Sequence, residues 1–544
     1  MKYIRHVQYV WPWAVVVAAA IWMGSPLWQA QDVVYGRIAG DGLATPWLYD
    51  WVARTLLTGG DLNAVGDFGF RNEFQRYRDF PSALDAFLAA PTSWLLDWPM
   101  QYSGAQGWAL ILNGLGVAAL AWAMGCRGIG VALAGVLGAS LEPVWKELWY
   151  ARMNAAWPGV AALALAAWLT VIGPRDKERR VWVTVLGALV AVGLGVLAAG
   201  VYPPTLLMLT PPAVACWLGG LRGSWVRSVF GLVVVGVALW LAWPLLSVML
   251  HSQRAWTFHC PAGSWVGFCQ DGTIGIPPSL GGGITMFDVG PQLSDWLGFQ
   301  PRYTVGSERY IAVGAWGLSG LCLLRSRGRA VLAVWLGVGF FLALLGQGPC
   351  PAGPGGQPSG WTVRTPGLGA ALNWTWCNTS ALHDFGRYTT ASLVLAAVCS
   401  GLGVEALGAR WKRVGRVCGT LLALVVMGQS IAFASTRALR ADRWEAVPTL
   451  ESSVLLKELE PGPIAELPFD SHAQLISVLE VPGLQRVNPF GGMEQGPNNL
   501  PFIQWLYGLG RGEVSSSTPT ASMAESSGVR WVLFDPSRCI PPFT

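Results

Sequence analysis

Long apolar segments separated by short polar connections occupy most of the chain. An α-helix needs about 20 mostly apolar residues to cross the hydrocarbon core of a bilayer. The pattern predicts spans at 11–30, 106–125, 128–145, 153–173, 181–200, 203–220, 228–250, 309–325, 329–347, 387–407 and 417–435. The fold class expected from it is mainly α, a polytopic bundle of about 11 membrane spans.

Lysine and arginine concentrate in every second connection, and this alternation predicts the orientation of the chain. The basic connections hold Lys2 and Arg5; Arg127; Arg175, Lys177, Arg179 and Arg180; Arg222 and Arg227; Arg325, Arg327 and Arg329; Arg410, Lys412, Arg413 and Arg416. Short cytoplasmic loops carry an excess of positive charge. We therefore expect a multi-pass protein of the bacterial inner membrane, with a cytoplasmic N-terminus and without a cleaved signal peptide.

Composition supports a membrane protein and excludes several other classes. The chain has 544 residues, of which 53% are hydrophobic and 12% are charged, and its mean hydropathy is +0.42. Soluble globular proteins carry roughly 25% charged residues, so a soluble enzyme, a disordered chain and a coiled coil are excluded. The sequence has no glycine-rich nucleotide-binding motif and nothing that indicates a nucleic-acid partner.

The longest polar segments fall on the predicted extracytoplasmic side. They are the first outer loop, 31–105, and the C-terminal tail, 436–544. The loop contains two stretches with helical spacing of apolar residues, 43–58 and 82–97, which predict helices lying along the membrane interface. The expected domains are thus a transmembrane domain, 1–435, and a small extracytoplasmic α/β domain, 436–544.

The tail's secondary structure follows from its local pattern. Segments 463–469 and 529–535 are predicted strands, 500–509 a short helix, and 513–527 a Ser/Thr-rich loop. This domain has two equally good interpretations. It could be a cap that covers outer loops, or it could have a direct catalytic role.

Acidic residues beside the outer ends of spans are the first candidates for chemistry, because charge at membrane depth is costly. Asp41 follows span one between two glycines, where its carboxylate could act as a general base toward a sugar hydroxyl. An ordinary Asp-Gly turn is the competing interpretation. Glu142 and Glu147 lie in the second outer loop, five residues apart and off a common helical face. Their competing interpretation is a solvated, charge-balanced loop.

A late outer loop ends at span ten with His383-Asp384-Phe385-Gly386-Arg387. The guanidinium of Arg387 suits a phosphate group, although an arginine extending to the interface explains the position equally well. Two cysteine pairs, Cys260 with Cys269 and Cys350 with Cys377, each share one outer loop. Because outer loops are oxidising, two local disulfides are expected. The histidines are too scattered to propose a metal site, and metal binding by these cysteines is the weaker alternative.

The layout resembles the GT-C superfamily of polytopic membrane glycosyltransferases. The resemblance rests on Gly40-Asp41-Gly42 and its interfacial helices, on the acidic second outer loop, on Phe385-Gly386-Arg387-Tyr388, and on the tail. In the tail it rests on the segments Ala465–Phe469, Val487–Gly492 and Gly528–Asp535.

This resemblance implies transfer of a sugar from a polyprenyl-phosphate-linked donor on the extracytoplasmic face. Asp41 would be the base, Glu142 or Glu147 would assist, and Arg387 would bind the donor phosphate. His383 and Asp50 complete the candidate substrate-binding residues, and a divalent cation is left open as a cofactor. The first loop departs from the family in lacking a paired-acid motif, because Asp50 lies nine residues after Asp41 inside a predicted helix.

Two other functions compete with glycosyl transfer. A transporter or flippase of lipid-linked saccharide predicts charges lining a path through the spans, and the spans contain almost none. A non-catalytic subunit of an envelope complex predicts an exposed apolar flank and stable partner proteins.

Overall fold

A computed structural model describes most of the chain, arranged as two compact units. The described residues are 2–36, 41–60, 84–150, 153–173, 181–218, 225–255, 313–345, 389–447, 458–459, 464–467 and 530–534. Unit 1 comprises residues 1–29, 106–149 and 153–441, and unit 2 comprises residues 30–105, 150–152 and 442–544. The expected domain boundary at 435 remains a prediction.

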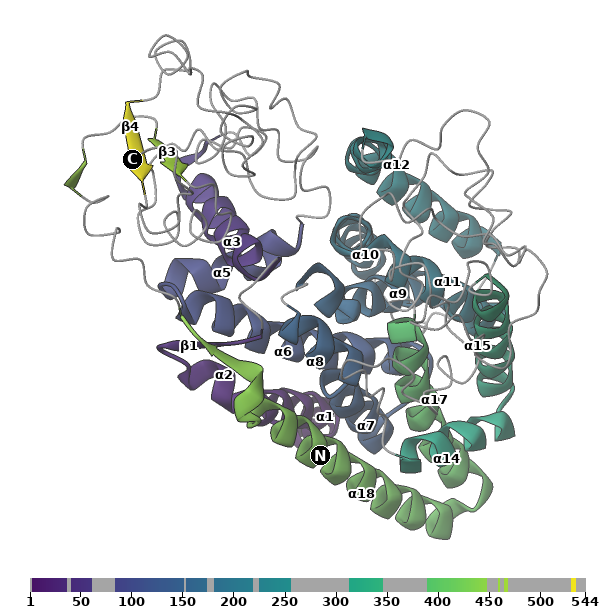
Figure 1. The fold of residues 1–544 in the computed structure, drawn as a ribbon. Coiled ribbons are helices and arrows are strands. Elements are labelled where there is room, and N and C mark those ends of the chain that lie inside the picture. The colour runs from purple at the N-terminus through teal and green to yellow at the C-terminus, as the bar shows by residue number, and fades with distance from the viewer. Residues whose placement is uncertain are drawn as a thin grey trace, which may run out of the picture. The chain divides into compact units, whose positions relative to one another are not determined.

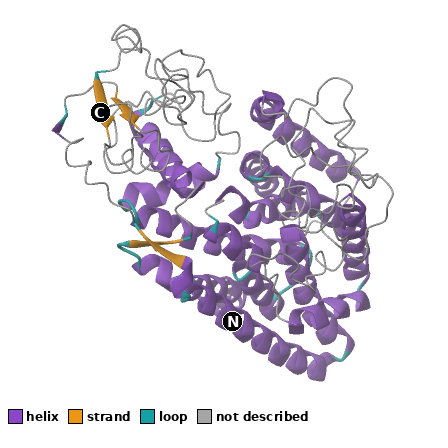
Figure 2. Cartoon of the chain, in the orientation of Figure 1, coloured by secondary structure: helices purple, strands orange, loops and turns teal. Residues whose placement is uncertain are grey.

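Unit 1 is built from helices (Figures 1 and 2). Its α-helices are α1 (Lys2–Met23), α2 (Ser25–Gln29), α6 (Met100–Ala123, which begins in unit 2), α7 (Gly128–Ala139), α8 (Glu142–Trp149), α9 (Pro158–Ile172), α10 (Val181–Val201), α11 (Pro203–Cys216), α12 (Trp225–Ala255), α14 (Val313–Leu321), α15 (Ser326–Leu345), α17 (Thr389–Arg410) and α18 (Lys412–Ala438). Short 3-10 turns are η2 (Met153–Ala156), η6 (Cys322–Leu324) and η9 (Ala441–Arg443), the last at the junction with unit 2.

Each of the eleven predicted spans coincides with at least one of these helices. Among the described residues, six helical stretches are long and apolar enough to cross a membrane, and four shorter apolar helices accompany them. The predicted span 128–145 consists of α7 followed, after Ser140 and Leu141, by α8. The chain therefore contains several candidate membrane helices, and the count of eleven stays a prediction.

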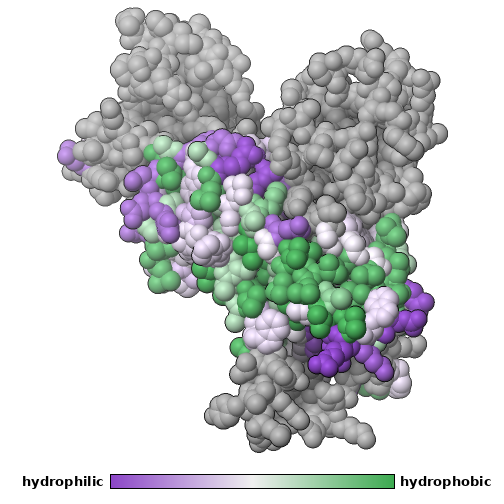
Figure 3. Space-filling view, turned by 90° about the horizontal axis from the view of Figure 1, so that it is seen from below, coloured by the Kyte–Doolittle hydropathy of each residue, from purple (hydrophilic) through white to green (hydrophobic). Residues whose placement is uncertain are grey.

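The helices differ strongly in how much apolar surface they expose. Helices α7 and α17 form the centre of the bundle and contact each other, and almost all of their side chains are buried. In contrast, α12 exposes large apolar side chains between Trp225 and Trp243, with Trp240 73% exposed. Hydrophobic residues also cover a broad area of the face in Figure 3. Exposed apolar surface of this extent is expected of helices that face lipid.

Helices α6 and α9 cross closely, and one polar side chain fixes the contact. Buried Asn113 on α6 donates from Nδ2 to the carbonyl oxygen of Ala156 over 2.8 Å, and its Oδ1 accepts from the backbone N–H of Gly159 over 2.8 Å. An added Cβ at Gly159 would collide with the backbone of Leu112 and Asn113. Asn113 thus satisfies the carbonyl oxygen of Ala156, the last residue of η2, and an N–H in the first turn of α9 that has no partner within the helix.

Unit 2 contains the predicted first outer loop and the tail, which are joined by a two-stranded antiparallel sheet. Strand β1 (Val33–Tyr35) pairs with β2 (Trp444–Ala446), in the register Val33 with Ala446 and Tyr35 with Trp444. The rings of Tyr35 and Trp444 meet edge to face, with centroids 5.5 Å apart. The chain after α1 and the chain after α18 therefore lie on the same face of the membrane, which requires an even number of crossings between them. The ten spans predicted in that interval agree with this parity.

Two further pairs of elements belong to unit 2. The helices predicted at 43–58 and 82–97 are present as α3 (Asp41–Thr58) and α5 (Asp85–Leu95), which pack against each other. Their place along the membrane interface stays a prediction. In the tail, β3 (Ile464–Leu467) pairs in parallel with β4 (Trp531–Phe534), at the two positions where strands are predicted. The predicted helix 500–509 and loop 513–527 lie outside the described residues. The complete α/β domain remains a prediction.

Candidate active site

Asp41, the candidate base, is the first residue of α3. An aspartate at this position is favourable, because the N-terminal end of a helix carries partial positive charge. The side chain of Asp41 lies outside the described part of the chain. Stacked indoles stabilise the same helix, since the rings of Trp47 and Trp51 lie 6.3 Å apart and both side chains are buried. Gly59, with a φ of +67°, follows the last residue of the helix, Thr58, which is also the predicted end of the segment 43–58.

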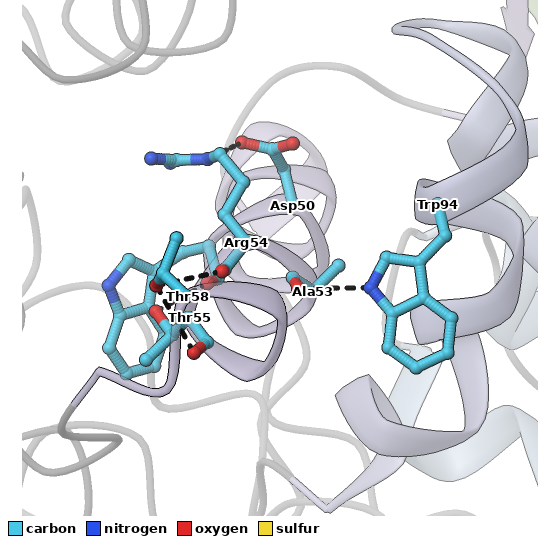
Figure 4. A network of polar contacts seen from close by, with 7 residues as sticks. Asp50, Ala53, Arg54, Thr55, Thr58 and Trp94 are labelled. Carbon is cyan, nitrogen blue, oxygen red and sulfur yellow. Dashed lines mark hydrogen bonds and ion pairs between the residues drawn. The ribbon is translucent and has the colours of Figure 1, made fainter.

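Asp50 lies inside α3, as the sequence predicts, and it forms an ion pair there. Its Oδ2 accepts from Nε of Arg54 over 2.7 Å, one helical turn further on. Figure 4 shows this pair on one side of α3 and Trp94 of α5 on another. Trp94 donates from its indole Nε1 to the carbonyl oxygen of Ala53 over 3.0 Å, and so ties α5 to α3. A role for Asp50 in substrate binding stays a prediction.

A buried carboxylate that the sequence reasoning missed lies in the first turn of α5. Asp85 is 3% exposed, and its Oδ2 accepts a hydrogen bond of 2.8 Å from the hydroxyl of Tyr49, which is 1% exposed. The only signal for it in the sequence is an acidic residue near the start of the predicted helix 82–97. That signal is equally typical of an exposed helix start, so it does not distinguish a buried acid.

Glu142 and Glu147 are not in a solvated loop, and this corrects one of the two interpretations of the sequence. Both lie in α8, where they are 3% and 5% exposed. Helix α8 packs against η2 and α18, and Gln106 of α6 donates to the carbonyl oxygen of Leu148 over 3.4 Å. A spacing of five residues does not place the two glutamates on one face of the helix. Both carboxylates are nevertheless buried, because neighbours surround α8.

Several predicted site residues lie outside the described residues, so their predictions are unchanged. They are Arg387, His383 and the four cysteines Cys260, Cys269, Cys350 and Cys377. Helix α17 begins at Thr389, two residues after Arg387. Across the described ranges, no group of three or more His, Cys, Asp or Glu side chains is arranged to hold a metal ion.

Comparisons with known proteins give a structural likeness and no match in sequence. No protein-family model matches the chain, and a search of curated proteins found no match. The apo oligosaccharyltransferase of Archaeoglobus fulgidus superposes with a TM-score of 0.50 at 12% identity, over 96% of this chain and 69% of that protein. The same enzyme in complex with an inhibitory peptide and a dolichol-phosphate gives 0.47 at 12% identity, over 96% and 69%.

A second enzyme gives a weaker likeness. The mycobacterial arabinofuranosyltransferase AftD matches with a TM-score of 0.43 at 16% identity, over 84% of this chain and 29% of that one. Both enzymes are GT-C membrane glycosyltransferases. The likeness to the oligosaccharyltransferase extends over nearly the whole chain. The chain therefore shares its overall fold with this oligosaccharyltransferase, as the resemblance in layout implies.

Proposed function

We propose that the chain is a membrane glycosyltransferase that moves a sugar from a polyprenyl-phosphate-linked donor to an acceptor on the extracytoplasmic face. Asp41 acts as the general base, one of Glu142 and Glu147 assists it, and Arg387 holds the donor phosphate. His383 lies near Arg387 in sequence and contributes to the same substrate site. Asp50 contributes to substrate binding together with Arg54, its ion-pair partner.

The burial of Glu142 and Glu147 is the observation that carries this proposal. A carboxylate removed from water costs several kcal/mol unless partners offset the loss of hydration. A helix that served only to close the bundle would place apolar side chains at these positions. Two buried acids on an eight-residue helix, in a fold shared with an oligosaccharyltransferase, are instead typical of a functional site, because buried ionisable groups are costly to keep.

The direct experiment measures sugar transfer by the purified full chain in proteoliposomes. The probe is a polyprenyl-phosphate monosaccharide with a radiolabelled sugar, and the measurement is loss of label from the lipid fraction. The variants are Asp41→Asn, Glu142→Gln and Glu147→Gln. Asp97→Asn is the matched control, because Asp97 is an exposed carboxylate in the same outer loop. A parallel reaction with a chelator tests the need for a divalent cation.

We expect Asp41→Asn to lower the rate constant by about 100-fold or more, in the range that general-base catalysis contributes. At least one of the two glutamine variants should lower it as well, and Asp97→Asn should not. Normal turnover by Asp41→Asn in well-folded protein would remove Asp41 as the base. Movement of intact donor between leaflets without loss of its sugar would instead favour the flippase.

A further inference from the structure

A large apolar groove opens among five helices of unit 1, at the arginine-bearing end of the bundle. Its volume is about 780 Å³, and residues of α1, α6, α7, α9 and α10 line it. Trp11 and Trp13 come from α1, Trp122 from α6, Leu163 from α9 and Leu194 from α10. The volume lies within the range of about 300–1,000 Å³ that is typical of small-molecule sites.

One end of the groove is cationic. Arg127, an exposed residue, lines it. Its Nη1 donates to the carbonyl oxygens of Trp122 over 2.9 Å and of Cys126 over 2.6 Å. The guanidinium carbon also lies 5.5 Å from the centroid of the Trp122 ring. These contacts fix the guanidinium beside the groove, and no described carboxylate forms an ion pair with it.

Two more arginines add positive charge around the same turn. Arg327 lies close to Gly125, because its Nη1 would be 2.8 Å from a Cβ added to that glycine. Burial raises the pKa of the Cys126 thiol, which lies in the connection between α6 and α7, while Arg127 and Arg325 act on that pKa in the opposite direction. The nearby acid is Glu405, whose Oε1 accepts from the backbone N–H of Arg127 over 2.9 Å. The described residues around this turn therefore include three arginines and Glu405.

The occupant of such a groove must have an apolar tail and an anionic head. Tryptophans at the groove suit the boundary between acyl chains and headgroups. Basic pockets between membrane helices bind anionic lipid headgroups, and a guanidinium can hold a phosphate with two hydrogen bonds. A zwitterionic phospholipid would bring its own cation to Arg127 and would be bound less well.

We propose that this groove binds an anionic phospholipid, with an acyl chain against Trp11, Leu163 and Leu194 and its phosphate at Arg127. This site is separate from the proposed transfer site, and it does not depend on glycosyltransferase activity. By the predicted topology, the lipid comes from the cytoplasmic leaflet.

The test compares lipid binding by the detergent-solubilised full chain, measured by native mass spectrometry. The probes are phosphatidylglycerol, phosphatidylcholine with the same acyl chains, and polyprenyl phosphate. Arg127→Gln removes the cation, and Ala167→Phe fills part of the groove. Arg413→Gln is the matched control, because Arg413 is an exposed arginine of α18 that does not line the groove. The melting temperature of each variant checks its folding.

We expect the wild-type chain to prefer phosphatidylglycerol over phosphatidylcholine by about fivefold, the size of one basic side chain's effect on an anionic lipid. Arg127→Gln should abolish that preference, Ala167→Phe should weaken both phospholipids, and Arg413→Gln should change neither. Equal binding of the two phospholipids by the wild-type chain, or a preference that survives Arg127→Gln, would overturn the proposal. Tighter binding of polyprenyl phosphate than of phosphatidylglycerol would assign the groove to a different lipid and would also overturn it.

Discussion

At the scale of single residues, the buried carboxylates are the unusual feature of this chain. Asp85, Glu142 and Glu147 are buried in the described part of the structure, where an ionised group requires compensating contacts. For Asp85, one such contact is the hydroxyl of Tyr49. Because a hydrogen bond to a charged group is stronger than one between neutral groups, this contact should contribute measurably to the pairing of α3 with α5.

Replacing Tyr49 by phenylalanine tests the contribution of this hydrogen bond. Tyr49→Phe leaves the ring in place and removes the donor, so we expect it to lower the free energy of unfolding by about 1.5–3 kcal/mol. The measurement is thermal unfolding of the purified chain in detergent. Thr58→Val serves as the control, because the Thr58 hydroxyl bonds only to carbonyls of its own helix at an exposed position. Equal melting temperatures for Tyr49→Phe and the wild-type chain would show that this bond does not stabilise the α3–α5 pair.

At the scale of elements, the close crossing of α6 and α9 depends on the absence of a side chain at Gly159. A Cβ there would lie 2.8 Å from the backbone nitrogen of Asn113 and closer still to other backbone atoms. Backbone cannot rotate away as a flexible side chain can. The two helices would have to separate, and that movement would strain the hydrogen bonds of Asn113.

Gly159→Ala should therefore destabilise the chain by about 1–3 kcal/mol, the usual effect of overpacking, as measured by thermal unfolding in detergent. Gly193→Ala, in α10, is the matched control, because nothing lies within 4 Å of its added Cβ and alanine favours a helix. If both variants melt at the same temperature, the α6–α9 crossing is looser than described.

Helix α8 shows why local patterns did not predict burial. The segment Glu142-Pro143-Val144-Trp145-Lys146-Glu147 has three charged residues in six, which is typical of an exposed loop. Its burial results from contacts with η2 and α18, and α18 begins about 260 residues later in the chain. The Tyr49–Asp85 bond likewise joins residues 36 positions apart. Neither arrangement leaves a periodic signal in the sequence.

Elements that depend on local hydrophobicity do leave a periodic signal in the sequence, and they were predicted well. The helices at the eleven predicted spans follow from apolar spacing, and so does α3, which occupies 41–58 where 43–58 was predicted. The strands β3 and β4 occur where short β-branched and apolar runs are bounded by turn residues. The domain that surrounds these strands depends on contacts between distant segments, and so does the arrangement of Asp41 and Arg387. The sequence pattern does not encode such contacts.

At the scale of the whole molecule, the β1–β2 sheet constrains the topology. The N–H of Gly36 donates to the carbonyl oxygen of Arg443, and the N–H of Val447 donates to that of Asp32. Along the ladder, these hydrogen-bonded positions alternate with the pairs Val33–Ala446 and Tyr35–Trp444. The latter are thus the non-hydrogen-bonded pairs of an antiparallel ladder, with Cα atoms about 4.5 Å apart. That separation permits a disulfide.

We expect Val33→Cys combined with Ala446→Cys to form a disulfide in cells, detected by mass spectrometry of the cross-linked peptide. The bond would confirm both the register and the exposure of the two segments to the same oxidising compartment. The control pair, Val34→Cys with Ala446→Cys, places the thiols on opposite faces of the sheet. Equal cross-linking of the two pairs would contradict the register, and cross-linking of neither would contradict the shared outer face.

The most direct measurement for the proposed function follows label from a polyprenyl-phosphate sugar in membrane vesicles of known sidedness. We expect wild-type protein to release the sugar from donor in the outer leaflet, Asp97→Asn to match it, and Asp41→Asn to reduce the rate about 100-fold or more. Rates that are the same for the wild-type chain and Asp41→Asn would contradict a base at Asp41. An absence of sugar release from every lipid-linked donor supplied would contradict the glycosyltransferase itself.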